Sequence, residues 1–93
     1  MNESKGQAAV LAESGNFSVV HLEGRRYPAV AVQGDSLKVL HEAVEELSGY
    51  LRSGDLAEAK FSFAEIQATI SSLKSFYERT LRDEGVGLPY IAE

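Results

Sequence analysis

The chain is short and acidic, and both properties exclude several classes of protein. Its 93 residues are 44% hydrophobic and 25% charged, which fits one small globular domain with too little core for a deep catalytic cleft. Nine Lys and Arg against fourteen Asp and Glu give a net charge of −5, which disfavours binding to nucleic acid or to an anionic membrane. The lack of cysteine excludes disulfides and thiolate metal sites. We expect a cytoplasmic protein with no cofactor, no metal site and no enzymatic activity.

The N-terminal third has the pattern of three short β-strands. An apolar run from Ala8 stops at residues 14–16, where Gly and Asn favour a turn. β-branched and aromatic residues at 17–22 predict the second strand. Apolar residues alternate at 27–33 and predict the third strand, with Pro28 at its beginning because proline cannot donate to a ladder. The order of these segments predicts a three-stranded antiparallel meander.

A helix is expected next, because the hydrophobic period changes from two residues to about three and a half. Asp35 or Ser36 is predicted to cap its N-terminus, and Gly54 is placed to close it in the left-handed conformation. Its apolar residues form one narrow stripe: Leu37, Leu40, Val44, Leu47 and Leu51.

The second predicted helix is unusually long. Asp55 and Glu58 have the spacing of a capping box, and the apolar pattern continues from Leu56 to about Glu84, roughly 43 Å at 1.5 Å per residue. A second capping-box spacing at Ser62 leaves a break in this helix as an alternative. The first helix covers little over half of this length, so self-association as a homodimer is expected through a stripe of the second helix. The residues expected on this oligomer surface are Phe63, Ile66, Ile70, Leu73 and Tyr77.

Together these segments predict an α+β fold in which a three-stranded antiparallel meander is followed by a two-helix hairpin, βββαα. Residues 1–6 are predicted to be disordered and residues 7–93 to form a single domain, because the first six residues hold little apolar surface. The tail after Gly85 is apolar and is expected to fold back onto the body as an extended segment.

Two groups of charged residues are candidates for binding a partner. Arg25 and Arg26 lie in the turn before the third strand, where adjacent guanidinium groups can hold a carboxylate or a phosphate. Glu42, Glu45 and Glu46 form an acidic surface on the first predicted helix, suited to a basic partner. Each group also has a simpler interpretation as charge that keeps the surface hydrated.

Neither histidine belongs to a recognised metal motif. His41 and Glu45 are four residues apart on the predicted helix, but helical zinc motifs combine two histidines with a third ligand. A hydrated helical pair is the better interpretation of these two residues. No Gly-rich phosphate loop and no Ser, His and Asp arrangement is identifiable, and no catalytic residue is predicted.

The junction of third strand and first helix, YPAVAVQGDSL at residues 27–37, resembles the HicB-type antitoxin domain. Pro28, Gly34 and Asp35 match that family, whereas Ala29 replaces its usual glycine and Ser36 its usual threonine. The resemblance covers roughly the first half of the chain. The whole chain is also similar to small uncharacterised bacterial proteins of unknown function. The HicB resemblance implies a sheet-and-helix surface that binds and neutralises a small toxin.

These observations lead to two hypotheses of different classes. The first is a non-enzymatic protein-interaction module of antitoxin or immunity type, which acts by occluding a protein partner such as a basic toxin. The alternative is a structural homodimerisation domain that uses the long second helix. A small-ligand role at Arg25 and Arg26 is a third and weaker hypothesis. The remainder of the chain lacks the basic recognition helix that DNA binding requires.

Overall fold

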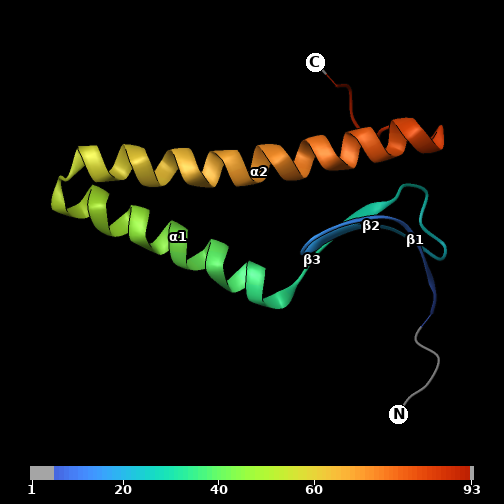
Figure 1. The fold of residues 1–93 in the computed structure, drawn as a ribbon, viewed down its shortest axis with the longest axis horizontal. Helices are drawn as coiled ribbons and strands as arrows, with labels where there is room; N and C mark the ends of the chain where they lie inside the picture. Colours follow the sequence, from blue (N-terminus) through green and yellow to red (C-terminus); the bar gives the residue numbers. More distant parts are fainter. Residues whose placement is uncertain (1–5, 93) are drawn as a thin grey trace, which may run out of the picture. The chain divides into compact units, whose positions relative to one another are not determined.

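A computed structural model describes residues 6–92 of the chain and confirms the α+β fold (Figure 1). Of residues 1–6, which were predicted to be disordered, residues 1–5 lie outside the described residues. In the part of the chain that is described, neither helix is long and apolar enough to cross a membrane. The elements follow in the expected βββαα order: β1 (Ala8–Ser14), β2 (Phe17–Leu22), β3 (Ala29–Val32), α1 (Gly34–Ser53) and α2 (Leu56–Glu84).

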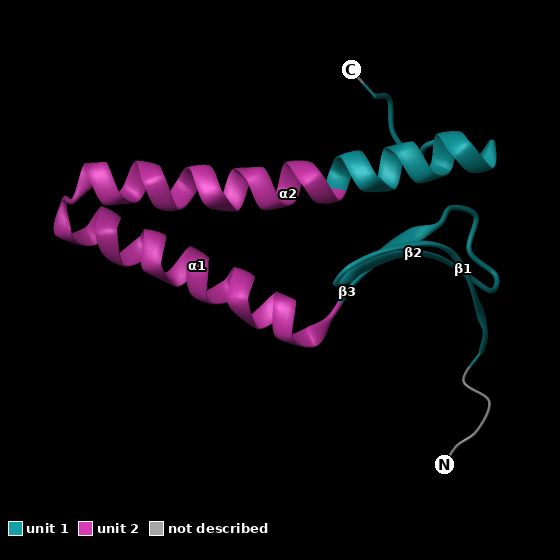
Figure 2. Ribbon diagram, in the orientation of Figure 1, with its two compact units in different colours: residues 1–32, 74–93 teal, residues 33–73 magenta. Residues whose placement is uncertain are grey.

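The fold consists of two compact units, which Figure 2 distinguishes by colour. The first contains the sheet, the C-terminal end of α2 and the tail, residues 1–32 and 74–93. The second, Gln33–Leu73, contains α1 and the greater part of α2. Helix α2 runs without interruption from Leu56 to Glu84, so the alternative of a break at Ser62 is wrong.

The sheet is the predicted antiparallel meander, with strand order β1-β2-β3. Gly15 has a φ of 60° in the tight turn between β1 and β2, a conformation that glycine adopts without steric cost. A β-bulge shifts the register between Val10 and Ala12, and Leu11 is the extra residue. The bulge interrupts the alternation of β1, so the neighbouring residues Leu11 and Ala12 both pack against the core.

The core of the first unit forms where the C-terminal end of α2 covers one face of the sheet. Val19 of β2 and Leu81 of α2 are fully buried, and Phe76 and Tyr77 pack with them. The hydroxyl of Tyr77 donates a buried hydrogen bond of 2.6 Å to the carbonyl oxygen of Pro28. Burial raises the pKa of the Tyr77 phenol. This hydrogen bond joins α2 to the start of β3, 49 residues away in the chain.

The C-terminal tail folds back onto the first unit, as expected, but it forms no strand up to residue 92. Gly85 has a φ of 69° and ends α2, and the amide of Val86 donates to the Leu81 carbonyl at 2.9 Å. Val86 and Leu88 pack against the core. Tyr90 then donates a hydrogen bond of 2.9 Å to the carboxylate of Glu78. The tail is therefore docked on α2 by apolar contacts and one charged hydrogen bond.

The helix ends in the second unit match the sequence analysis only in part. Helix α1 begins after Gln33, which makes no side-chain capping bond, so the predicted cap by Asp35 or Ser36 is wrong. Asp35 lies inside the first turn, and its carboxylate accepts only from the next amide. By contrast, Gly54 closes α1 with a φ of 79°, and Asp55 caps α2 by accepting from the Glu58 amide at 3.2 Å.

Burial within the second unit is slight. Helix α1 has no buried residue, and on the part of α2 in this unit Ala59, Ser62 and Ile66 are buried. Since α1 is the other helix of this unit and lies alongside this part of α2 (Figure 2), we interpret the line of these three residues as the side of α2 toward α1. Ile66 is therefore part of the interior of the chain, as is Tyr77 in the first unit. Because both side chains are buried, neither is available for the predicted oligomer surface.

Candidate functional site

The face of the sheet opposite the core is apolar and uncovered. Because side chains alternate along a strand, Val19 points into the core and Val20 points to this open face. Val20 pairs with Val10 of β1 and with Ala29 of β3, so the three side chains form a row across the sheet. Val10 is 58% and Leu22 42% exposed. We call this surface, formed by Val10, Val20, Leu22 and Ala29, the open sheet face.

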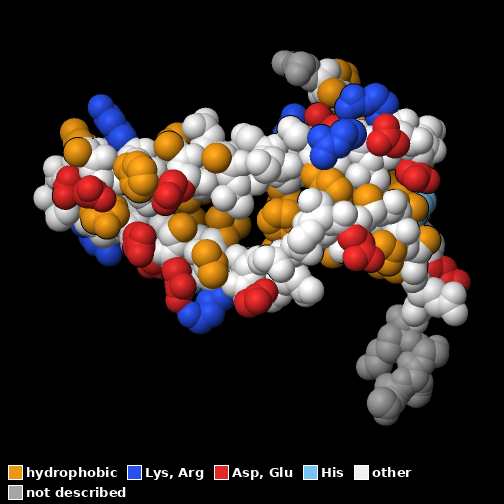
Figure 3. Space-filling view, viewed as in Figure 1, with side chains coloured by type: hydrophobic (Ala, Val, Ile, Leu, Met, Phe, Trp, Pro, Cys, Tyr) orange, Lys and Arg blue, Asp and Glu red, His pale blue; other side chains and the backbone are white. Residues whose placement is uncertain are grey.

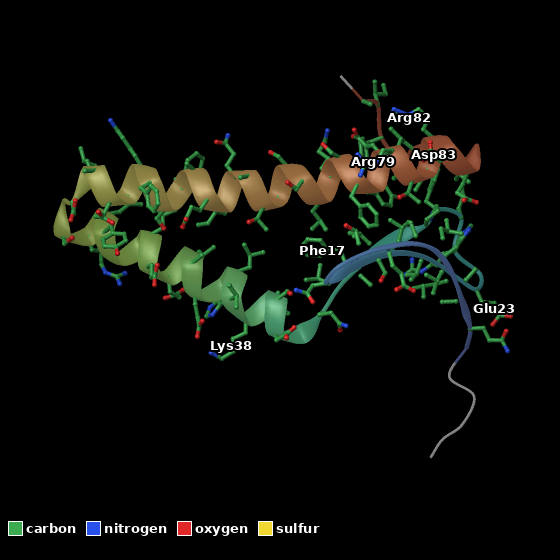
Figure 4. The ribbon with its side chains drawn as sticks, viewed as in Figure 1. Phe17, Glu23, Lys38, Arg79, Arg82 and Asp83 are labelled. Atoms are coloured by element: carbon green, nitrogen blue, oxygen red, sulfur yellow. The ribbon has the colours of Figure 1, made fainter. Side chains whose placement is uncertain are left out.

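The turn that carries the two arginines connects β2 to β3 and is anchored at both ends. It begins at Glu23, which Figure 4 labels, directly after β2, and Gly24 has a φ of 82° within it. The imidazole of His21 donates from Nε2 to the Arg25 carbonyl at 2.8 Å, so His21 acts as a structural donor. At the other end, the buried Pro28 carbonyl accepts the hydrogen bond from Tyr77. These two hydrogen bonds fix the position of the turn within the first unit.

A shallow hollow of about 370 Å³ lies between this turn and the open sheet face. The guanidinium group of Arg26 lies over the ring of Tyr27, 5.2 Å from its centroid, in a cation–π contact. Among the described residues, neither Arg25 nor Arg26 forms a salt bridge. An apolar floor beside two exposed guanidinium groups suits an apolar group that carries a carboxylate or a phosphate. The lining residues are Leu22, Arg25, Arg26, Tyr27 and Ala29.

The predicted acidic surface of α1 is partly neutralised by its own helix. Figure 3 shows acidic side chains spaced along α1. Lys38, labelled in Figure 4, forms a salt bridge with Glu42, and Nε2 of His41 lies 3.7 Å from the carboxylate of Glu45. Glu46 forms no salt bridge within residues 6–92. The three carboxylates therefore offer a basic partner less unpaired charge than their number implies.

The remaining residues of the predicted oligomer surface differ in exposure. Phe63 and Ile70 are each 51% exposed, whereas Leu73 is half-buried. Other large apolar side chains of both hairpin helices are exposed as well, so the uncovered surface is not confined to α2. In residues 6–92 no group of three or more His, Asp or Glu side chains is arranged to hold a metal ion.

Comparison with known families matches residues 3–90 to the family of unknown function DUF6959. The chain belongs to this family. The match covers both units, from the region of β1 to the docked tail. No curated protein and no solved structure matches the chain significantly. The resemblance of residues 27–37 to the HicB-type domain stays a prediction.

Sequence reasoning did not identify the residues of the open sheet face or the apolar lining of the hollow. A signal was present in β2, where Ser18, Val20 and Leu22 form the set that alternates with Phe17 and Val19. Two of these three residues are apolar, which is unusual for the hydrated face of an antiparallel sheet. The two arginines were identified, but their position beside this face depends on the path of the turn.

Proposed function

We propose that this chain is a protein-interaction module of antitoxin or immunity type, which binds and occludes a protein partner through the open sheet face. The observation that carries the proposal is the continuity of this apolar face with the hollow beside Arg25 and Arg26. Exposed apolar surface rimmed by polar groups is characteristic of protein contact sites. A three-stranded sheet in so small a chain gains stability when a partner covers its second face.

The partner that fits this surface is an apolar segment bearing a carboxylate or a phosphate. Arginine guanidinium groups bind such anions with two parallel hydrogen bonds, and Arg25 and Arg26 have no competing acidic partner among the described residues. The other candidate, a basic toxin docked on α1, is less favoured because Lys38 and His41 already lie against two of the three carboxylates. The open sheet face is thus the preferred partner surface.

The experiment is affinity capture with matched bait variants. Four baits are compared in native lysate. They are the wild-type chain, the double variant Arg25→Glu with Arg26→Glu, the single variant Val10→Glu and the control Arg79→Glu. Arg79 is an exposed arginine on α2, labelled in Figure 4, and its reversal changes the charge without touching the turn. A captured protein is then purified and its affinity for each variant is measured at two salt concentrations.

We expect the double arginine variant and Val10→Glu to weaken binding at least about tenfold, while Arg79→Glu binds like the wild type, since buried contacts control affinity and distant charges mainly affect rates. A partner that tolerates both changes but is lost with Glu45→Lys and Glu46→Lys would place docking on α1 instead. If no protein other than the chain itself is retained, the proposal of a partner is rejected.

A further inference from the structure

The second unit, Gln33–Leu73, which contains the helical hairpin, carries an uncovered apolar surface distinct from the open sheet face. Eight large hydrophobic side chains within residues 33–73 are exposed, and six of them form two stripes with steps of seven residues. Side chains seven apart on a helix point in nearly the same direction, because successive residues are about 100° apart. The stripes are Leu37, Val44 and Leu51 on α1, and Leu56, Phe63 and Ile70 on α2; we call these six residues the hairpin face.

Both stripes lie on the same side of the hairpin. The α1 stripe is rotated by roughly 70° from the half-buried line of Leu40, Ala43 and Leu47. The α2 stripe is rotated by roughly 60° from the direction of Ile66, in the same sense when each helix is followed from its N-terminus. Since the two helices are antiparallel, equal rotations in the same sense bring both stripes to one side. The remaining two exposed hydrophobic residues, Val39 and Phe61, lie on the opposite side.

The six side chains form three matched layers. Leu51 and Leu56 flank the connection between the helices, and equal steps of seven residues place Val44 and Phe63, and likewise Leu37 and Ile70, at matching sequence distances from that connection. Figure 2 shows α1 and α2 closest at the connection and diverging away from it. The layers are about 10 Å apart. Each helix therefore has two adjacent lines, one toward the other helix that is apolar except for Ser62 on α2, and one apolar line open to solvent, which is the pattern of half a four-helix bundle.

We infer that a second copy of this chain covers the hairpin face, with α1 of one copy beside α2 of the other in an antiparallel four-helix bundle. The six side chains are 44–60% exposed, so at about 200 Å² for a large side chain they present roughly 600 Å². A stable interface of standard size buries about 800 Å² on each partner. The face and its rim supply that area on both sides when the partner is an identical hairpin.

Two-fold symmetry allows identical faces to pack in two ways, and side-chain volume distinguishes them. With the axis along the helices, α1 lies beside α2 of the other copy, and each Val44 meets a Phe63. With the axis across the helices, each helix lies beside its own equivalent, so Val44 meets Val44 and Phe63 meets Phe63. Facing layers pack best when small residues oppose large ones. Volume therefore favours the axis along the helices.

Charge at the rim favours the same arrangement. Glu45 and Lys60 are exposed on the outer edges of α1 and α2. With the axis along the helices, they come within reach of each other across the interface, because Lys60 is at the level of Leu47. With the axis across the helices, Glu45 approaches its own equivalent and Lys38 approaches Arg52. Opposite charges at such flanking positions select partner and orientation.

The first test measures molecular mass by sedimentation, with a matched pair of variants. Phe63→Glu places a charge in the middle layer, while Phe61→Glu makes the same change two residues away, on the opposite side of α2. We expect the wild type and Phe61→Glu to sediment as dimers and Phe63→Glu as a folded monomer by circular dichroism. Leu51→Glu, at the connection, provides a second disruptive variant in case Phe63→Glu does not fold.

The second test reverses the rim charges. Glu45→Lys and Lys60→Glu should each weaken dimerisation, by up to about tenfold because two pairs become repulsive, and the double reversal should restore it. A double reversal that fails to restore affinity overturns the arrangement of α1 beside α2. A monomeric wild type at high micromolar concentration overturns the inference entirely, but leaves the proposed partner surface standing, since that surface is probed by Arg25 and Arg26.

Discussion

The hydrogen bond from Tyr77 to the Pro28 carbonyl is the most specific link between α2 and the sheet, and Tyr77→Phe removes it without changing the ring. Both residues are buried, and the donor–acceptor distance is 2.6 Å. A typical hydrogen bond contributes about 0.5–1.5 kcal/mol, and leaving a buried acceptor unsatisfied costs about 1–3 kcal/mol. We therefore expect Tyr77→Phe to lower the free energy of unfolding by about 1–3 kcal/mol.

Urea denaturation followed by circular dichroism measures this loss. For a chain of this size the slope is near 1 kcal/mol per molar urea, so the midpoint should fall by about 1–3 M. The matched control is Tyr90→Phe, whose hydroxyl bonds Glu78 at the surface, where water replaces the lost partner. Its expected loss is below about 1 kcal/mol. Equal midpoints for Tyr77→Phe and the wild type would refute the argument that the Pro28 carbonyl depends on this donor.

Three further predictions concern the core, a turn and the tail. Leu81→Ala should cost about 2–5 kcal/mol in urea denaturation because Leu81 is fully buried, whereas Ile91→Ala, at an 89% exposed position, should change stability by less than about 0.5 kcal/mol. Gly54→Ala should cost about 1 kcal/mol through its φ of 79° alone, since the added methyl group would meet no atom within 4 Å; a neutral effect on thermal unfolding would contradict this. Partial burial raises the pKa of Tyr90 from an ordinary 10 to about 12, and the hydrogen bond to Glu78 is the next largest cause. Docking of the tail is therefore stabilised below pH 10, and this stabilisation is lost as the pH rises through 12. An NMR titration of the Tyr90 ring should show this value, and Glu78→Gln should lower it; an unchanged value in the variant would mean that the carboxylate has no part in it.

Several local features were predictable from sequence because their causes lie within a few residues. The strand at 17–22 follows from its β-branched residues, and the end of α1 follows from Gly54, which adopts the left-handed conformation. The Asp55 cap was correctly predicted for the same reason. The cap at the start of α1 was predicted incorrectly. The helix already begins at Gly34, so Asp35 lies inside its first turn. The two arginines were also identified as a candidate site, since their chemistry is evident from residue type.

Only the tertiary structure decided which apolar residues are interior. The heptad pattern of α2 treats Phe63, Ile66 and Tyr77 alike, yet the fold buries Ile66 and Tyr77 and leaves Phe63 half exposed. The physical reason is that a periodic stripe defines only one side of a helix. Burial depends on which other element packs against that side and at what angle. In β2 the same limit applies, because Val19 and Val20 are equally apolar, and the side on which α2 packs makes one of them core and the other part of the open face.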